Sequence, residues 1–172
     1  MKLLEIQSSP RGESSDSITL TQSFIEACKN DNTSIVVDTL NVWHERLPEF
    51  DYEAIGTKYK AVKHETMTAA EYKVWERIQS LIQRFRSADR IVLGTPMWNF
   101  GPPYKLKQLI DLVAQRNYLF TYDGKQYGPL FNVKRQSSSI HAVHVSWRDS
   151  STAFAIRSPG NLFGLLVAPC GC

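Results

Sequence analysis

Residues 91–100 read Ile-Val-Leu-Gly-Thr-Pro-Met-Trp-Asn-Phe, a short apolar strand that leads directly into a loop rich in aromatic side chains. Gly-Pro-Pro follows at 101–103, and prolines suit the first turn of the helix that we expect next. Open α/β sheets hold their ligands beyond the carboxyl ends of their strands. The loop after this strand is therefore the first candidate for a binding site.

Strands and helices alternate on both sides of this stretch. Residues 2–7 and 34–40 have the composition of strands. A helix is expected from about 15–17, with three side chains repeating at helical spacing on one face, Leu20, Phe24 and Cys28. Parallel strands crossed by helices predict an α/β fold, a doubly wound parallel sheet with helices on both faces.

Two further helices and a hairpin complete the pattern. Thr68-Ala69-Ala70-Glu71 is a capping box, and apolar residues repeat behind it at 74–85. The helix after the prolines is predicted to bury four side chains, Leu106, Leu109, Ile110 and Val113. Residues 118–127 indicate a hairpin with an Asp-Gly turn. Trp43 and Trp75 are predicted to be core or interface residues.

Composition excludes several classes of function. The chain has 172 residues, enough for one domain with a core, and 42% of them are hydrophobic. Its net charge of +3 is spread along the chain, whereas nucleic-acid-binding proteins usually carry a basic cluster. No apolar run approaches the roughly 20 residues that cross a bilayer. The three cysteines lack metal-ligand spacing and no secretory signal opens the chain, so we expect no metal and a cytoplasmic location.

The turn after the first strand is rich in serine, Ser8-Ser9-Pro10-Arg11-Gly12-Glu13-Ser14-Ser15-Asp16-Ser17. Its hydroxyls and the amides of a helix start suit a phosphate, because the helix dipole favours an anion there. Taken alone, this turn favours the alternative that its serines simply cap the helix. The Walker and Gly-x-Gly-x-x-Gly motifs are missing, which argues against a nucleoside triphosphatase and a Rossmann-type dinucleotide site.

The aromatic loop suits a flat ring with polar edges, and flavin is the candidate. Backbone amides and the Asn99 carboxamide suit the ring's carbonyl and nitrogen edges, and Trp98 or Phe100 can pack near it. The alternative is a hydrophobic loop that closes the end of the sheet. Two such loops at neighbouring strand ends favour one ligand that has both a phosphate and a ring.

These residues resemble the FMN-dependent NADH-azoreductase and quinone reductase family, which has a flavodoxin-like fold. The similarity extends over roughly residues 1–135, the predicted flavodoxin-like FMN-binding domain. The matching segments are Ser8-Ser9-Pro10-Arg11, Ser15-Asp16-Ser17, Thr95-Pro96-Met97-Trp98-Asn99-Phe100, Leu106-Lys107-x-x-Ile110-Asp111, Phe120-Thr121-Tyr122 and Gly128-Pro129.

The resemblance implies a site and an activity. The FMN phosphate is expected at Ser9, Ser15, Asp16 and Ser17, and the ring at Met97, Trp98, Asn99 and Phe100. Tyr122 matches a family tyrosine near the substrate side. The family uses no acid–base pair and no metal, because the flavin carries the electrons. NADH is the implied donor, a quinone or an azo compound is the acceptor in ping-pong turnover, and azo cleavage yields amines. A homodimer is also implied.

The resemblance breaks after residue 135, and residues 136–172 are predicted to form a divergent C-terminal tail. The family's last strand and closing helix are therefore expected to be altered or missing. A natural variant and a coding sequence that leaves its reading frame near residue 136 both explain the change. Two other functions stay open, an NADPH-dependent FMN reductase and an inactive flavin-binding module.

Overall fold

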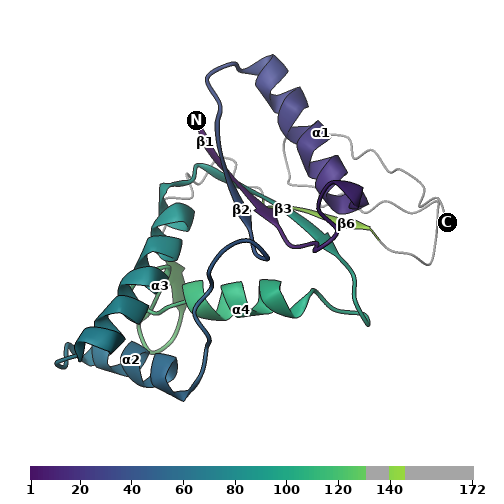
Figure 1. The fold of residues 1–172 in the computed structure, drawn as a ribbon. Coiled ribbons are helices and arrows are strands. Elements are labelled where there is room, and N and C mark those ends of the chain that lie inside the picture. The colour runs from purple at the N-terminus through teal and green to yellow at the C-terminus, as the bar shows by residue number, and fades with distance from the viewer. Residues whose placement is uncertain (131–139, 146–172) are drawn as a thin grey trace.

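The computed structural model describes residues 1–130 and 140–145, and Figure 1 shows their arrangement. Parallel strands form one sheet in the order β2-β1-β3-β6, and β4 and β5 form a separate antiparallel hairpin. The strands are β1 (Lys2–Gln7), β2 (Val36–Asn41), β3 (Arg90–Pro96), β4 (Phe120–Tyr122), β5 (Tyr127–Pro129) and β6 (Ile140–Val145). The helices are α1 (Asp16–Asp31), α2 (Tyr52–Lys63), α3 (Ala69–Ser87) and α4 (Tyr104–Val113), with a 3-10 turn at η1 (Gly12–Ser14).

Helices cover both faces of the sheet, as predicted. In Figure 1, α1 lies on one face, while α3 and α4 lie on the other and α2 packs beside α3. Successive side chains of a strand point to opposite faces. On β1, Leu4 and Ile6 accordingly join the core formed with α3 and α4, whereas Leu3 packs with Ile25 of α1. The predicted doubly wound α/β sheet is thereby confirmed.

The strongest sequence pattern, at α3, is confirmed in detail. Thr68 and Glu71 form the predicted capping box, with the Thr68 amide donating to Glu71 Oε2 at 2.8 Å. Trp75 is buried and meets Tyr118 edge to face at 5.3 Å. The α3 side chains buried in the core are Trp75, Ile78, Leu81 and Ile82.

The predicted buried face of α4 was wrong in part, whereas on α1 the three residues predicted to share a face, Leu20, Phe24 and Cys28, are all half-buried. The fully buried apolar side chains of α1 are Ile18 and Ile25. Thr21 is buried with them, and its hydroxyl donates to Glu5 Oε1 at 3.1 Å. The side chains that α4 buries are Leu106, Leu109, Leu112 and Val113. Ile110 lies outside this stripe and is 43% exposed.

The strand β6 continues the parallel sheet next to β3, with Ile91 opposite Ile140 and Pro96 opposite Val145. Residues 131–139 and 146–172 lie outside the described part of the chain. The domain boundary at residue 135 and the rest of the predicted tail, apart from β6, fall there and stay predictions. No helix among the described residues is long and apolar enough to cross a membrane.

The first turn of α1 lies unusually close to β3. A Cβ atom on Gly94 would lie 3.0 Å from the Ser17 carbonyl oxygen and 3.1 Å from Thr21 Cγ2. These distances are shorter than most real Cβ contacts, so the start of α1 has to move by a few tenths of an ångström to admit a side chain. Glycine at this position therefore determines how closely the start of α1 approaches the sheet.

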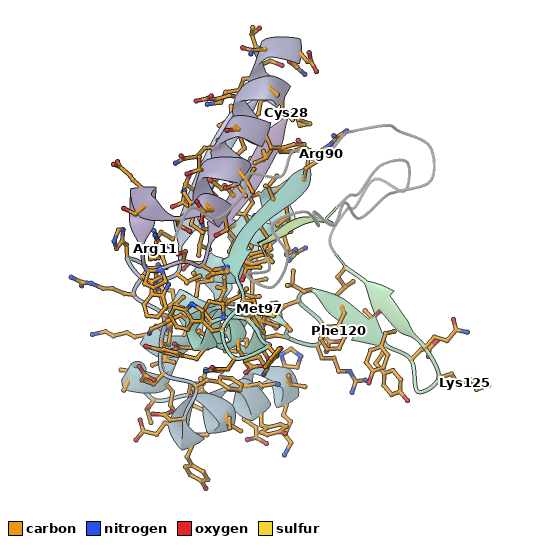
Figure 2. The ribbon with its side chains drawn as sticks, turned by 90° about the vertical axis from the view of Figure 1, so that its right-hand side faces the viewer. Arg11, Cys28, Arg90, Met97, Phe120 and Lys125 are labelled. Carbon is orange, nitrogen blue, oxygen red and sulfur yellow. The ribbon has the colours of Figure 1, made fainter. Side chains whose placement is uncertain are left out.

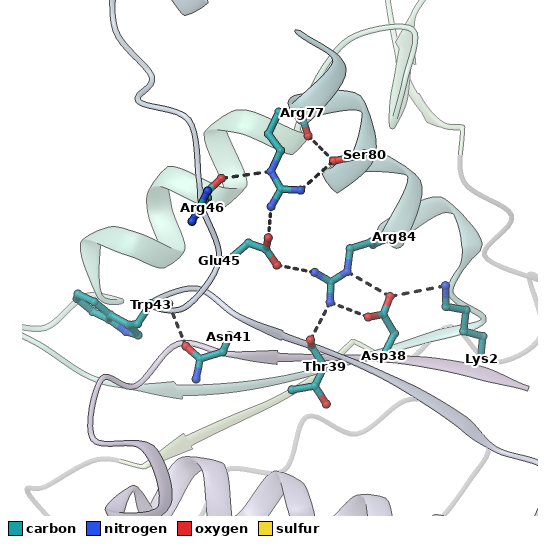
Figure 3. A network of polar contacts seen from close by, with 10 residues as sticks. All are labelled: Lys2, Asp38, Thr39, Asn41, Trp43, Glu45, Arg46, Arg77, Ser80 and Arg84. Atoms are coloured by element: carbon teal, nitrogen blue, oxygen red, sulfur yellow. Dashed lines mark hydrogen bonds and ion pairs between the residues drawn. The ribbon is translucent and has the colours of Figure 1, made fainter. Parts of the chain in front are cut away.

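A polar network ties β2 and the turn after it to α3 (Figure 3). Arg84 Nη2 lies 2.6 Å from Asp38 Oδ1, and Arg84 Nη1 donates to Glu45 Oε2 at 2.8 Å. Arg77 binds the other oxygen of Glu45, and Lys2 Nζ lies 3.6 Å from Asp38 Oδ2. The hydrogen bonds from Arg84 hold the pKa of the Asp38 carboxyl below its ordinary value.

Replacing Arg84 by methionine should lower the free energy of unfolding at neutral pH by about 1–3 kcal/mol, because two partly buried carboxylates lose a partner. The lowered folded-state pKa of Asp38 makes this contribution present above its ordinary pKa of 3.8 and lost as the pH falls through the folded value. Urea unfolding at several pH values should show a difference that shrinks below about pH 4. Arg86→Met is the control, since Arg86 is exposed; an equal loss there would contradict the assignment.

Gly94→Ala should lower the free energy of unfolding by about 1–3 kcal/mol, because the added methyl group overpacks the contact with α1. Gly56→Ala is the matched control: Gly56 lies in α2, where an added Cβ meets nothing within 4 Å. That variant should gain about 0.5–1 kcal/mol from helix propensity. Urea unfolding of both variants decides the matter, and a gain in stability for Gly94→Ala would refute the close packing.

Candidate cofactor site

Two loops meet at the carboxyl edge of the sheet because β1 and β3 are neighbours in parallel register. Ser8, the first residue after β1, donates to the Gly94 carbonyl through its amide at 2.9 Å and its hydroxyl at 3.0 Å. In Figure 2, Arg11 and Met97 lie toward this edge, whereas Cys28 and Arg90 lie at the opposite end of the sheet. The fold therefore brings together the two loops that the sequence singled out.

The serine turn gathers buried hydroxyl groups at the start of α1. Ser9, Ser15 and Ser17 are all buried, and the hydroxyls of Ser15 and Ser17 lie 3.0 Å apart. Ser9 Oγ accepts a hydrogen bond from the Arg11 amide at 3.3 Å. Ser15 occupies the position that precedes the helix, yet its side chain makes no capping hydrogen bond. The capping alternative is therefore wrong for Ser15, whose hydroxyl pairs with Ser17 instead.

Asp16 begins α1 between these two serines. A carboxylate at a helix start is favourable because the unpaired amides and the helix dipole make that end positive. The same carboxylate repels a phosphate, so the contribution that Asp16 can make to anion binding is its backbone amide. Of the four residues expected at the phosphate, the three serines offer buried hydroxyls and Asp16 offers main chain.

The aromatic loop folds back on itself in a tight turn. The Trp98 amide donates to the Gly101 carbonyl at 2.7 Å, and the Gly101 amide donates to the Trp98 carbonyl at 2.8 Å. The two residues between them, Asn99 and Phe100, have φ values of 46° and 64°. This left-handed conformation is unfavourable for a phenylalanine, and such local strain concentrates at ligand-binding segments.

The same turn presents its aromatic rings outward. Phe100 is 71% exposed and Trp98 is 39% exposed, whereas Met97 is half-buried. The alternative of a hydrophobic plug is therefore wrong for Trp98 and Phe100, because a plug buries its rings. Exposed aromatic side chains beside a cluster of hydroxyl groups form a surface that suits a ring with a polar substituent.

Tyr122 lies on the hairpin formed by β4 and β5, apart from the contacts of these two loops. Its ring stacks on Tyr127 at 4.6 Å, its hydroxyl donates to the Gly124 carbonyl at 2.9 Å, and its carbonyl accepts from Arg116. In Figure 2 the hairpin projects sideways, with Lys125 at its tip. The substrate-side role of Tyr122 stays a prediction.

The sequence did not assign a site role to Trp43. Its ring is half-buried and packs against the core, as predicted, but its indole also contacts both loops of the candidate site. The residue lies just after β2, at the same edge of the sheet, and this position was the available signal. Among the described residues, no group of three His, Cys, Asp or Glu side chains is placed to hold a metal ion.

Comparison with known proteins identifies the family of this chain. The flavodoxin-like fold family matches residues 1–146 of the chain, which include β6. The chain is 52% identical over 160 residues to the FMN-dependent NADH:quinone oxidoreductase 2 of Burkholderia lata, covering 93% of this chain and 75% of that protein. It is 42% identical over 125 residues to the FMN-dependent NADH:quinone oxidoreductase 2 of Pseudomonas syringae pv. tomato, but spans only 60% of that protein.

The fold is also similar to a solved structure, an FMN-dependent NADH-azoreductase from Bacillus anthracis in complex with FMN. The TM-score is 0.76 and the sequence identity is 25%, with 88% of this chain and 71% of that chain covered. Fold and sequence identity thus agree. The chain belongs to the flavodoxin-like family and, within it, to the FMN-dependent NADH:quinone oxidoreductases.

Proposed function

We propose that this chain binds FMN at the carboxyl edge of its sheet and acts as an FMN-dependent NADH:quinone oxidoreductase that also cleaves aromatic azo compounds to amines. The observation that carries the proposal is the joining of two chemically different loops through the Ser8–Gly94 hydrogen bonds. One loop supplies buried hydroxyls at a helix start, and the other supplies exposed aromatic rings. FMN has the matching parts, a phosphate and a flat ring.

The phosphate half of FMN fits the serine turn. The paired hydroxyls of Ser15 and Ser17 are buried, and the Ser15 hydroxyl is not used to cap the helix. A helix of 16 residues stands behind them and contributes the positive end of its dipole. Hydroxyl and amide donors of this kind bind phosphate without a lysine, as at other helix N-termini. Ser9, two residues after the end of β1, completes the group of buried hydroxyls.

The ring half of FMN fits the turn at residues 97–100. Trp98 and Phe100 offer apolar surface, and the Asn99 carboxamide and the neighbouring amides offer partners for the ring's polar edge. The reciprocal hydrogen bonds between Trp98 and Gly101 hold the turn in one conformation, so little ordering is needed when a ligand binds. When bound, FMN supplies the two-electron redox chemistry that links NADH to a quinone or azo acceptor.

The side chains of this site bind and orient the reactants in our proposal, and none is required as a nucleophile or metal ligand. Donor and acceptor use the same exposed surface in turn, which gives ping-pong kinetics. We also propose a homodimer, supported by the exposed apolar side chains Phe100, Tyr104 and Ile110 on and beside α4. The cytoplasm is the proposed location, because NADH is available there.

A steady-state assay with NADH and menadione tests the activity. In the absence of oxygen, protein supplied with FMN should sustain NADH oxidation only when the quinone is present, and double-reciprocal plots at several quinone concentrations should be parallel lines. Faster turnover with NADPH would instead favour an NADPH-dependent FMN reductase. A chain that binds FMN but oxidises neither nucleotide would be an inactive flavin-binding module.

Ser17→Ala should raise the Kd for FMN at least about tenfold, because a hydrogen bond to a charged phosphate contributes more than a neutral one. Ser23→Ala is the control on the same helix, since Ser23 is exposed and bonds only to the Thr19 carbonyl among the described residues. Quenching of flavin fluorescence measures both constants. An unchanged Kd for Ser17→Ala would remove Ser17 from the phosphate site.

A further inference from the structure

Trp43 is placed between the two loops of the candidate site and touches each of them. Its indole Nε1 donates to the Ser8 carbonyl at 2.9 Å, which joins it to the serine turn. Its ring lies 5.9 Å from the ring of Trp98 in the aromatic loop, and meets Tyr104 of α4 edge to face at 5.4 Å. One side chain therefore spans from the phosphate half of the site to the ring half.

The backbone of Trp43 is held by a chain of hydrogen bonds that begins inside the sheet. The Trp43 amide donates to Asn41 Oδ1 at 2.9 Å, as Figure 3 shows. Asn41 Nδ2 donates to Gln7 Oε1 at 3.3 Å, and Gln7 Nε2 donates to the buried Glu5 at 3.0 Å. Both Glu5 and Gln7 belong to β1, so these hydrogen bonds connect the backbone of Trp43 to a central strand of the sheet.

The turn that carries Trp43 is also fixed from the other side. Glu45, two residues further on, is bound by Arg77 and Arg84 of α3 (Figure 3). Val42 and Leu47, which flank this turn, are both buried in the core. The indole therefore stands on a rigid support, as a residue must if it is to set the position of others.

We infer that Trp43 is a positioning residue that couples the two halves of the site, holding the serine turn at the correct distance from the aromatic loop. This inference rests on the proposed FMN site. FMN engages both halves at once, so its affinity depends on their relative placement. Riboflavin has the ring without the phosphate, so it depends on the ring half alone.

Trp43→Phe separates these two contributions. The variant keeps an aromatic ring beside Trp98 and Tyr104 but loses the hydrogen bond to the Ser8 carbonyl. The Kd for FMN should rise about three- to tenfold, the effect of one lost hydrogen bond, while the Kd for riboflavin should change less than about twofold. Fluorescence titration of both flavins against wild type and variant measures the ratio.

Trp75→Phe is the matched control, because Trp75 is a buried core residue that meets Tyr118 and lies outside the site. That variant should lose thermal stability without changing the ratio of the two flavin affinities. Equal losses of FMN and riboflavin affinity in Trp43→Phe would show a merely structural role and overturn the inference. An unchanged FMN affinity would overturn it as well.

Hydrogen–deuterium exchange of the flavin-free protein tests the role of Trp43 independently of FMN binding. Trp43→Phe should speed exchange in peptides covering residues 8–15 and leave residues 96–101 unchanged, whereas Trp43→Ala should speed exchange in both. If wild type binds no FMN but exchange changes in this way, the coupling stands and the FMN site is refuted. Exchange that stays at the wild-type rate in both variants would refute the coupling itself.

Discussion

The relative position of the two loops of the site depends on Gly94. Its carbonyl group accepts two hydrogen bonds from Ser8, and the bare Cα of the same residue lets Ser17 and Thr21 of α1 approach β3. The start of the serine turn and the start of α1 are thereby fixed to one strand, two residues before that strand ends at Pro96. Because the aromatic loop leaves from that same end, the geometry of both loops depends on this contact.

The two faces of the sheet stabilise the fold in different ways. The face covered by α3 and α4 buries the larger hydrophobic cluster, whereas the face under α1 combines a small apolar cluster with a buried carboxylate, Glu5. Glu5 accepts hydrogen bonds from Gln7, Thr21 and Thr39. Apolar burial is non-directional, while hydrogen bonds specify orientation. The placement of α1, and with it the serine turn, is therefore specified by directional contacts.

Local patterns predicted much of the fold and part of the site. The capping box at Thr68 and the apolar repeat behind it defined α3, because both signals act within a few residues. The apolar repeat on α1 could not reveal that Thr21 is buried, since its partner Glu5 lies 16 residues away in β1. The site role of Trp43 could not be predicted from local sequence either. Its partners, Ser8 and Trp98, are brought together only by the strand order, which no local pattern contains.

The most direct test of the account is retention of FMN by the wild-type chain. The purified protein is incubated with excess FMN and separated by size-exclusion chromatography, and the visible absorbance of the protein peak gives the amount bound. We expect close to one FMN per chain, because the serine turn and the aromatic loop form one site. A colourless protein peak, with all FMN eluting as free flavin, would contradict it.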